Sequence, residues 1–91
     1  MAMIAVFLNI DEERVDLALK EAGGNLDSTQ GEAVLDFSSV HRIDSSALQA
    51  LEEFARIAEE KAIKVVLRGV NVDVFKVLKL VKLTRRFSFV N

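Results

Sequence analysis

The chain contains no cysteine, proline, tryptophan or tyrosine, and it has one histidine, His41. The absence of cysteine excludes disulfide bonds, thiol nucleophiles and thiolate metal sites, and a single histidine cannot build a multi-histidine site. No stretch approaches the roughly 20 apolar residues that a membrane-spanning helix needs. The apolar start at residues 3–8 is too short for a secretory signal and has no basic residue before it. We therefore expect a cytoplasmic protein without a membrane span.

Composition indicates one folded domain over residues 1–91, because 51% of the residues are hydrophobic and 29% are charged. The net charge of −2 hides an asymmetry: residues 1–60 carry 13 acids and 4 bases, and residues 61–91 carry 8 bases and 1 acid. The basic segment could be a patch for nucleic acid or anionic lipid. We favour a solvated helix face, since no nucleic-acid motif accompanies the bases, and we expect no direct contact with nucleic acid.

The hydrophobic periodicity predicts strands that alternate with helices. The strands are expected at residues 3–8, 33–37, 63–67 and 87–90. The helices are expected from Asp11–Glu13 to a stop at Gly23-Gly24, then at residues 46–61 and 70–83. The periodicity places Val81 on the buried face of the last helix, Phe75 is expected in the core, and Arg68-Gly69 is expected to end the third strand. This order predicts a small α/β sandwich with a mostly parallel four-stranded sheet and about three helices. In such a sheet the functional loops lie at the carboxyl ends of the strands.

The segment at residues 34–48 combines an apolar strand, a polar loop and the start of a helical pattern. It places Ser45 and Ser46 at a helix N-terminus, where unpaired backbone N–H groups favour a phosphate. Capping alone also explains serine at such a place. Ser46 and Gln49 have the spacing of a capping box, while Asp44 or Ser45 could serve as the cap instead.

This segment resembles the STAS family, which includes the anti-sigma factor antagonists. The positions that match the family pattern are Asp36, Ser38, Val40, Ile43, Asp44, Ser45, Ser46 and Leu48. The resemblance implies a STAS-like sandwich and a non-enzymatic module of transcription regulation. Its partner would be an anti-sigma factor with serine kinase activity, which phosphorylates Ser46. Asp11 would lie near the phosphorylation site, and the implied partner-binding residues are Asp36, Ser38, Ser39, Asp44, Ser45, Ser46 and Gln49.

The sequence departs from the family pattern in three places. Ala47 replaces the usual glycine after the serines. The chain lacks room for the extra N-terminal strand of many members, so we expect an exposed sheet edge near residues 3–8 that a homodimer partner could cover. It also stops at Asn91 without the terminal helix that is common in the family.

Two other functions stay open. The chain could be a constitutive subunit of a larger complex, such as a lipid-transport ATPase assembly or a stressosome-type scaffold. It could also be a small ligand-binding protein that uses the loop acids. We predict no catalytic residues, because a hydrolytic site built from Asp36, Asp44 and Ser46 has no evident base. Two carboxylates are a weak metal signal, and no glycine-rich phosphate loop exists, so neither a metal nor another cofactor is expected.

Overall fold

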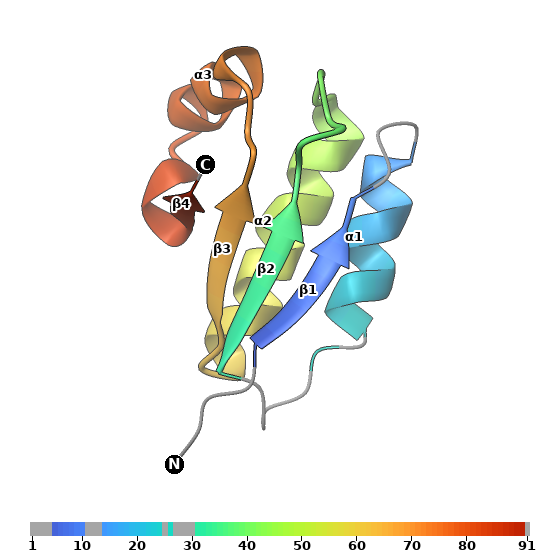
Figure 1. Ribbon diagram of the computed structural model, residues 1–91, viewed down its shortest axis with the longest axis vertical. Helices are drawn as coiled ribbons and strands as arrows, with labels where there is room; N and C mark the ends of the chain where they lie inside the picture. Colours follow the sequence, from blue (N-terminus) through green and yellow to red (C-terminus); the bar gives the residue numbers. More distant parts are fainter. Residues whose placement is uncertain (1–4, 11–13, 25, 27–30, 91) are drawn as a thin grey trace.

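The computed structural model describes residues 5–10, 14–24, 26 and 31–90, and for residues 5–9 it describes the backbone. Strands and helices alternate along the chain (Figure 1). In order they are β1 (Ala5–Asn9), α1 (Val15–Gly24), β2 (Glu32–Asp36), α2 (Ser45–Glu60), β3 (Lys64–Arg68), α3 (Val72–Leu80), the 3-10 helix η1 (Thr84–Arg86) and β4 (Ser88–Val90). The predicted α/β architecture with four strands and three α-helices is confirmed.

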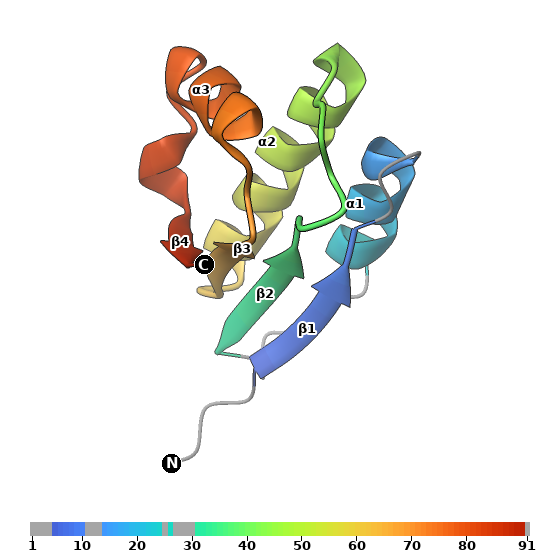
Figure 2. The same cartoon turned by 45° about the horizontal axis from the view of Figure 1, so that its top comes forward.

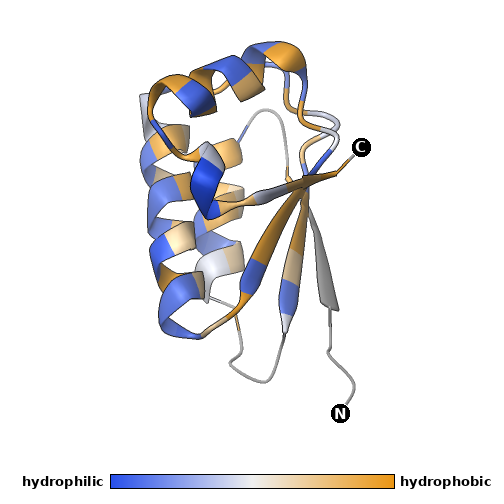
Figure 3. Cartoon of the chain, turned by 90° about the vertical axis from the view of Figure 1, so that its left-hand side faces the viewer, coloured by the Kyte–Doolittle hydropathy of each residue, from blue (hydrophilic) through white to orange (hydrophobic). Residues whose placement is uncertain are grey.

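The sheet has the strand order β1-β2-β3-β4, and every pair is parallel. The order of the strands across the sheet is therefore the same as their order in the sequence. Right-handed crossovers then place all the connecting helices over one face, and Figures 1 and 3 show this two-layer arrangement. β1 and β4 are the edge strands, and the carboxyl ends of β2 and β3 meet at one edge.

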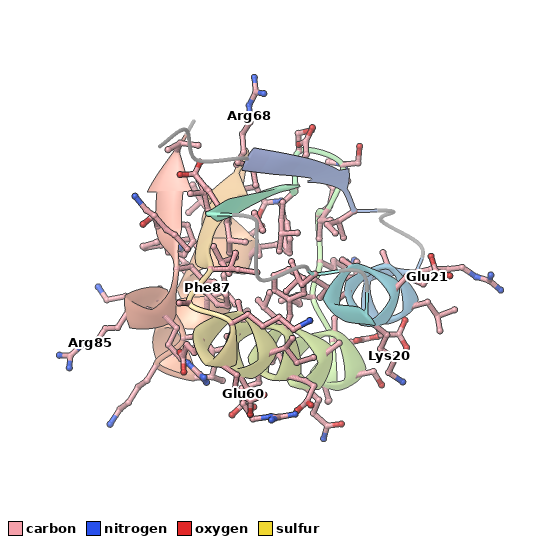
Figure 4. The ribbon with its side chains drawn as sticks, turned by 90° about the horizontal axis from the view of Figure 1, so that it is seen from below. Lys20, Glu21, Glu60, Arg68, Arg85 and Phe87 are labelled. Atoms are coloured by element: carbon pink, nitrogen blue, oxygen red, sulfur yellow. The ribbon has the colours of Figure 1, made fainter. Side chains whose placement is uncertain are left out.

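The hydrophobic core lies between the sheet and the helix layer. The strands alternate, so that Leu35 and Leu67 are fully buried within the core. Val34 and Val66 point to the opposite face, where Glu32 is paired in register with Lys64 and Asp36 with Arg68. Figure 4 shows Arg68 projecting from the sheet on the side away from the helices. Among the described residues, no helix is long and apolar enough to cross a membrane.

Local hydrogen bonds determine where α2 begins and ends. The Asp44 carboxylate accepts a hydrogen bond from the Ala47 N–H at 2.8 Å, so Asp44 is the N-cap and Ser46 is not. At the other end, Ala62 adopts a left-handed conformation with φ 55°. The Ile63 N–H then donates to the Ala58 carbonyl at 2.8 Å, which closes a Schellman motif.

The third helix is shorter than predicted. Lys82 has φ 62°, and the Leu83 N–H donates to the Leu78 carbonyl at 2.9 Å, so the regular helix ends at Leu80 and η1 follows. Val81, which the periodicity placed on the buried face, is therefore 46% exposed. Phe75 was predicted to be core but is 39% exposed, and its ring meets Phe89 edge to face at 5.1 Å between centroids.

The first helix differs from the prediction at one described end. It continues through Gly23 and Gly24, which were expected to stop it. Gly23 is buried where α1 meets α2. A Cβ at this position would lie 3.2 Å from Ile57 Cδ1, so the two helices approach closely here. The predicted helix start at Asp11–Glu13 lies outside the described residues.

Asn71 joins α3 to the loop that follows β2. Its side-chain oxygen accepts a hydrogen bond from the Val74 N–H at 2.8 Å, which caps α3. Its side-chain N–H group donates to the carbonyls of Val40 and His41, both at 3.3 Å. One amide therefore fixes the start of α3 against the loop that leads to α2.

The left-handed backbone conformation of Ala62 predicts a stabilising substitution. Ala62→Gly should raise the free energy of unfolding by about 0.5–1 kcal/mol, because glycine avoids the left-handed penalty but loses more chain entropy on folding. Urea unfolding would measure this change. Ala18→Gly, in the right-handed helix α1, is the matched control and should be destabilising. A loss of stability in Ala62→Gly would contradict the role given to this residue.

Two substitutions separate the functions of Asn71. Asn71→Ala should cost about 1 kcal/mol for the lost cap, together with the two hydrogen bonds to the loop. Asn71→Asp keeps the capping acceptor and loses the donor, so it should be less destabilising. Amide hydrogen exchange at residues 41–43 should accelerate in both variants. Equal unfolding free energies for the two variants would show that the cap contributes nothing, and unchanged exchange in the loop would show that the tether is unimportant.

Candidate functional site

The partner-binding residues predicted from sequence lie on one continuous segment at the carboxyl edge of the sheet. Figure 2 shows this segment rising from β2 and turning into α2. Asp36 is the last residue of β2, Ser38 and Ser39 lie in an exposed turn, and Asp44 caps α2. The first two helical residues, Ser45 and Ser46, are exposed, and so is Gln49 one turn later. Asp11, predicted to lie near the phosphorylation site, is outside the described residues.

Asp36 closes the turn that begins the segment. One of its carboxylate oxygens accepts a hydrogen bond from the Ser38 N–H at 2.9 Å. Hydrogen bonds from the Ser38 hydroxyl and N–H lower the pKa of Asp36, and the positive charge of Arg68 acts in the same direction. This carboxylate is therefore ionised at neutral pH and held within its own turn.

Gly69 supports this turn from the neighbouring strand end. It has φ +70°, and a Cβ at this position would lie 3.0 Å from the Ser38 Cβ. Its N–H donates to the Val90 carbonyl at 3.1 Å. Only glycine permits both the backbone conformation and the close approach. From sequence, Gly69 was interpreted as the end of a strand, and its contact with Ser38 could not be predicted.

The start of α2 offers hydrogen-bond donors and a hydroxyl that the fold does not use. Because Asp44 is the cap, its carboxylate binds the Ala47 N–H. Within the described part of the chain, no acceptor binds the N–H of Ser45 or Ser46, and the Ser46 hydroxyl makes no hydrogen bond. An anionic group would be stabilised by such N–H groups and by the helix dipole. The nearby Asp44 charge opposes it.

A groove of about 390 Å³ lies between α1 and α2 and has Ser46 and Gln49 at its border. Its floor includes Phe54 and Ile57, and charged side chains from both helices lie along its walls. These charged residues are Asp16, Lys20 and Glu53. Figure 4 shows Lys20 on the outer side of the helix layer, away from the sheet. The groove could not be predicted because the sequence does not give the separation of the two helices.

The two acids of this segment are engaged with the backbone of their own turns. Asp36 and Asp44 are each bound to a backbone N–H of their own turn. Among the described residues, no group of three or more His, Asp or Glu side chains could hold a metal ion. The arrangement is an exposed polar surface beside a partly apolar groove, which suits recognition of another macromolecule.

Asn71 is the residue that the sequence analysis missed. It lies outside the matching segment, yet its side chain holds the carbonyls of Val40 and His41 just before the Asp44 cap. The only sequence signal was an amide residue before an apolar helical pattern, which is typical of an N-cap. That signal predicts the cap on α3 but says nothing about the bond to the loop.

Comparisons with known proteins agree with this geometry. The structure resembles a sulfate transporter family protein from Wolinella succinogenes, with a TM-score of 0.78 and 20% identity over 98% of this chain and 80% of that chain. It resembles a putative anti-sigma factor antagonist from Thermotoga maritima, with a TM-score of 0.71 and 25% identity over 96% and 73%. The STAS domain of a SulP transporter from Vibrio cholerae gives a TM-score of 0.69 and 21% identity over 99% and 75%.

At the sequence level, no curated protein gives a significant match. The profile of the STAS domain, however, matches residues 4–91, which is nearly the whole chain. This chain therefore belongs to the STAS domain family.

Proposed function

We propose that this STAS domain is a non-enzymatic switch that binds an anti-sigma factor with serine kinase activity. The partner contacts the loop at residues 36–39, the turn at residues 44–46 and the start of α2. Phosphorylation of Ser46 then releases the partner. The observation that carries this proposal is the exposed hydroxyl of Ser46 at the N-terminus of α2, which makes no hydrogen bond to the other described residues.

The position of the cap supports a functional role for this serine. A serine at a helix start is ordinarily explained by capping. Here Asp44 accepts the hydrogen bond from Ala47, so capping does not account for Ser46. A phosphate on Ser46 leaves the hydrogen bond between Asp44 and Ala47 in place.

Charge and shape explain how phosphorylation would oppose binding. A phosphate adds about −1.5 to −2 charges and three acceptor oxygens. On Ser46 it would stand at the border of the groove between α1 and α2, next to Gln49. A partner side chain seated in this groove would meet both the added bulk and the added charge. The interface is then disrupted without unfolding of the domain.

A second candidate function is a constitutive subunit of a transport complex. Two of the similar solved structures come from a sulfate transporter family protein and a SulP transporter. In that role Ser46 would be a contact residue, and the groove would be occupied permanently. Ala47, where the family pattern has glycine, is buried in the hydrophobic core, so this departure does not distinguish the two candidate functions.

Phosphorylation can be tested directly by mass. Incubation with ATP and an anti-sigma serine kinase should add the mass of one phosphate to the intact protein. Ser46→Ala should abolish this addition, because its side chain has no hydroxyl. Ser45→Ala is the matched control and should still be modified. Unmodified wild-type protein would favour the constitutive subunit. A phosphate on Ser46→Ala would show that another residue is the phosphorylation site.

An acidic substitution separates partner binding from stability. Ser46→Glu should weaken binding in a pull-down with the kinase partner, because it places negative charge at the proposed interface. Its melting temperature should be unchanged or slightly higher, because an acid in the first turn of a helix stabilises the folded state by about 0.3–1 kcal/mol. Ser46→Gln, which has a similar shape without the charge, is the control. Equal affinity of wild type and Ser46→Glu would place the turn outside the interface.

A further inference from the structure

The outer side of α3 carries apolar side chains that the fold leaves in water. Leu80 is 82% exposed and Val72 is 68% exposed. Phe75, Val81 and Val90 are also exposed, and among the described residues Leu17 is the one large exposed apolar side chain elsewhere. Figure 3 shows apolar and polar residues alternating along α3. Isolated exposed apolar residues are ordinary, but a cluster on one element suggests a contact surface.

Basic side chains flank these apolar residues. From residue 69 to the end of the chain the sequence contains one acid, Asp73. A hollow at the end of α3 is lined by basic side chains together with Thr84; the basic residues are Lys79, Lys82, Arg85 and Arg86. Arg86 is paired with Glu59 at 2.8 Å. In the part of the chain that the structure describes, Lys79, Lys82 and Arg85 have no carboxylate partner.

The combination of exposed apolar residues and cations restricts the occupant. A second copy that used the same surface would bring two basic patches together, which is unfavourable. Nucleic acid would satisfy the cations, but its phosphate backbone would leave Leu80 and Val72 in water. An anionic bilayer accepts both groups, since cations bind headgroups and apolar side chains enter the boundary with the acyl chains. A bilayer also accepts protruding side chains such as Leu80 without a matching cavity.

We infer that α3 and η1 form a peripheral docking surface for an anionic lipid bilayer. Leu80 and Val72 enter the headgroup boundary, and Lys79, Lys82 and Arg85 bind the lipid phosphates. This surface lies on the β4 side of the molecule, whereas the groove between α1 and α2 lies on the β1 side (Figures 1 and 2). The two surfaces can therefore be occupied at the same time, and the inference does not depend on the proposed switch.

Flotation with lipid vesicles tests the charge requirement. The protein should bind vesicles of phosphatidylcholine mixed with phosphatidylglycerol and should not bind pure phosphatidylcholine. Each cation removed should reduce the partition coefficient by about fivefold at low salt, so Lys79→Gln combined with Lys82→Gln should give about a twenty-fivefold loss. Lys64→Gln, on β3 and away from this surface, should bind as wild type does. Absence of wild-type binding, or an equal loss in Lys64→Gln, would overturn the inference.

The absence of tryptophan makes insertion measurable. In Leu80→Trp the single tryptophan should shift its emission to the blue when anionic vesicles are added, because the indole leaves water. Leu17→Trp, on α1, should show no shift. Circular dichroism confirms that both variants are folded. A shift that is equal in both variants, or absent in Leu80→Trp, would overturn insertion at α3.

Competitors distinguish the other polyanionic partners. Duplex DNA and poly-glutamate should not displace the protein from anionic vesicles at matched charge concentration. Leu80→Ala should weaken vesicle binding by about fivefold, since it removes apolar area that enters the boundary. Displacement by DNA together with unchanged binding of Leu80→Ala would assign the cations to nucleic acid. Displacement by poly-glutamate together with unchanged binding of Leu80→Ala would assign the cations to an acidic protein. Either outcome would refute lipid docking.

Discussion

The sequential parallel order of the strands is the constraint on which the rest of the structure depends. Because each strand pairs in parallel with the one before it, each connection must cross the sheet and must contain a helix. The same handedness at every crossing places the helices in one layer. The carboxyl ends of β2 and β3 consequently meet, which brings Gly69 against Ser38. The turn before α2 is thus shaped by a strand end that lies more than thirty residues away in the chain.

Two kinds of bond transmit this constraint to the candidate site. Asp36 and Asp44 make bonds within their own turns, and these bonds fix the local backbone. Asn71 makes a long-range bond from the start of α3 to the loop carbonyls of Val40 and His41. The site is therefore held from both sides by the sheet edge and by a neighbouring helix. Such support holds the segment in one conformation, which would lower the entropic cost of the association that we propose.

The sequence predicted the elements because they depend on local signals, and the same signals single out the candidate site segment, whose function stays a prediction. Apolar runs such as residues 33–37 identify buried strands, and the Asp-Ser-Ser turn before an amphipathic pattern identifies a helix start. The sequence did not decide among Asp44, Ser45 and Ser46 as the cap, since both residue types are suited to that position. The structure resolves this choice in favour of Asp44.

The remaining errors arise from tertiary contacts. Val81 follows the helical period and Phe75 was expected in the core, but both are exposed, and Phe75 contacts β4 through the ring of Phe89. The end of α3 at Leu80 depends on Lys82 adopting a left-handed conformation, which residue propensity disfavours. The groove between α1 and α2 likewise depends on how closely the helices approach at Gly23. Periodicity describes one element at a time and carries no information on these distances.

The assignment of the cap to Asp44 has an evolutionary consequence. Position 44 contributes to folding, so substitutions there reduce stability unless another capping residue replaces it. The side chain at position 46 makes no hydrogen bond among the described residues, so a substitution there removes no side-chain hydrogen bond from this part of the fold. A lineage can exchange the serine for another small residue, or recover it later, while the domain continues to fold.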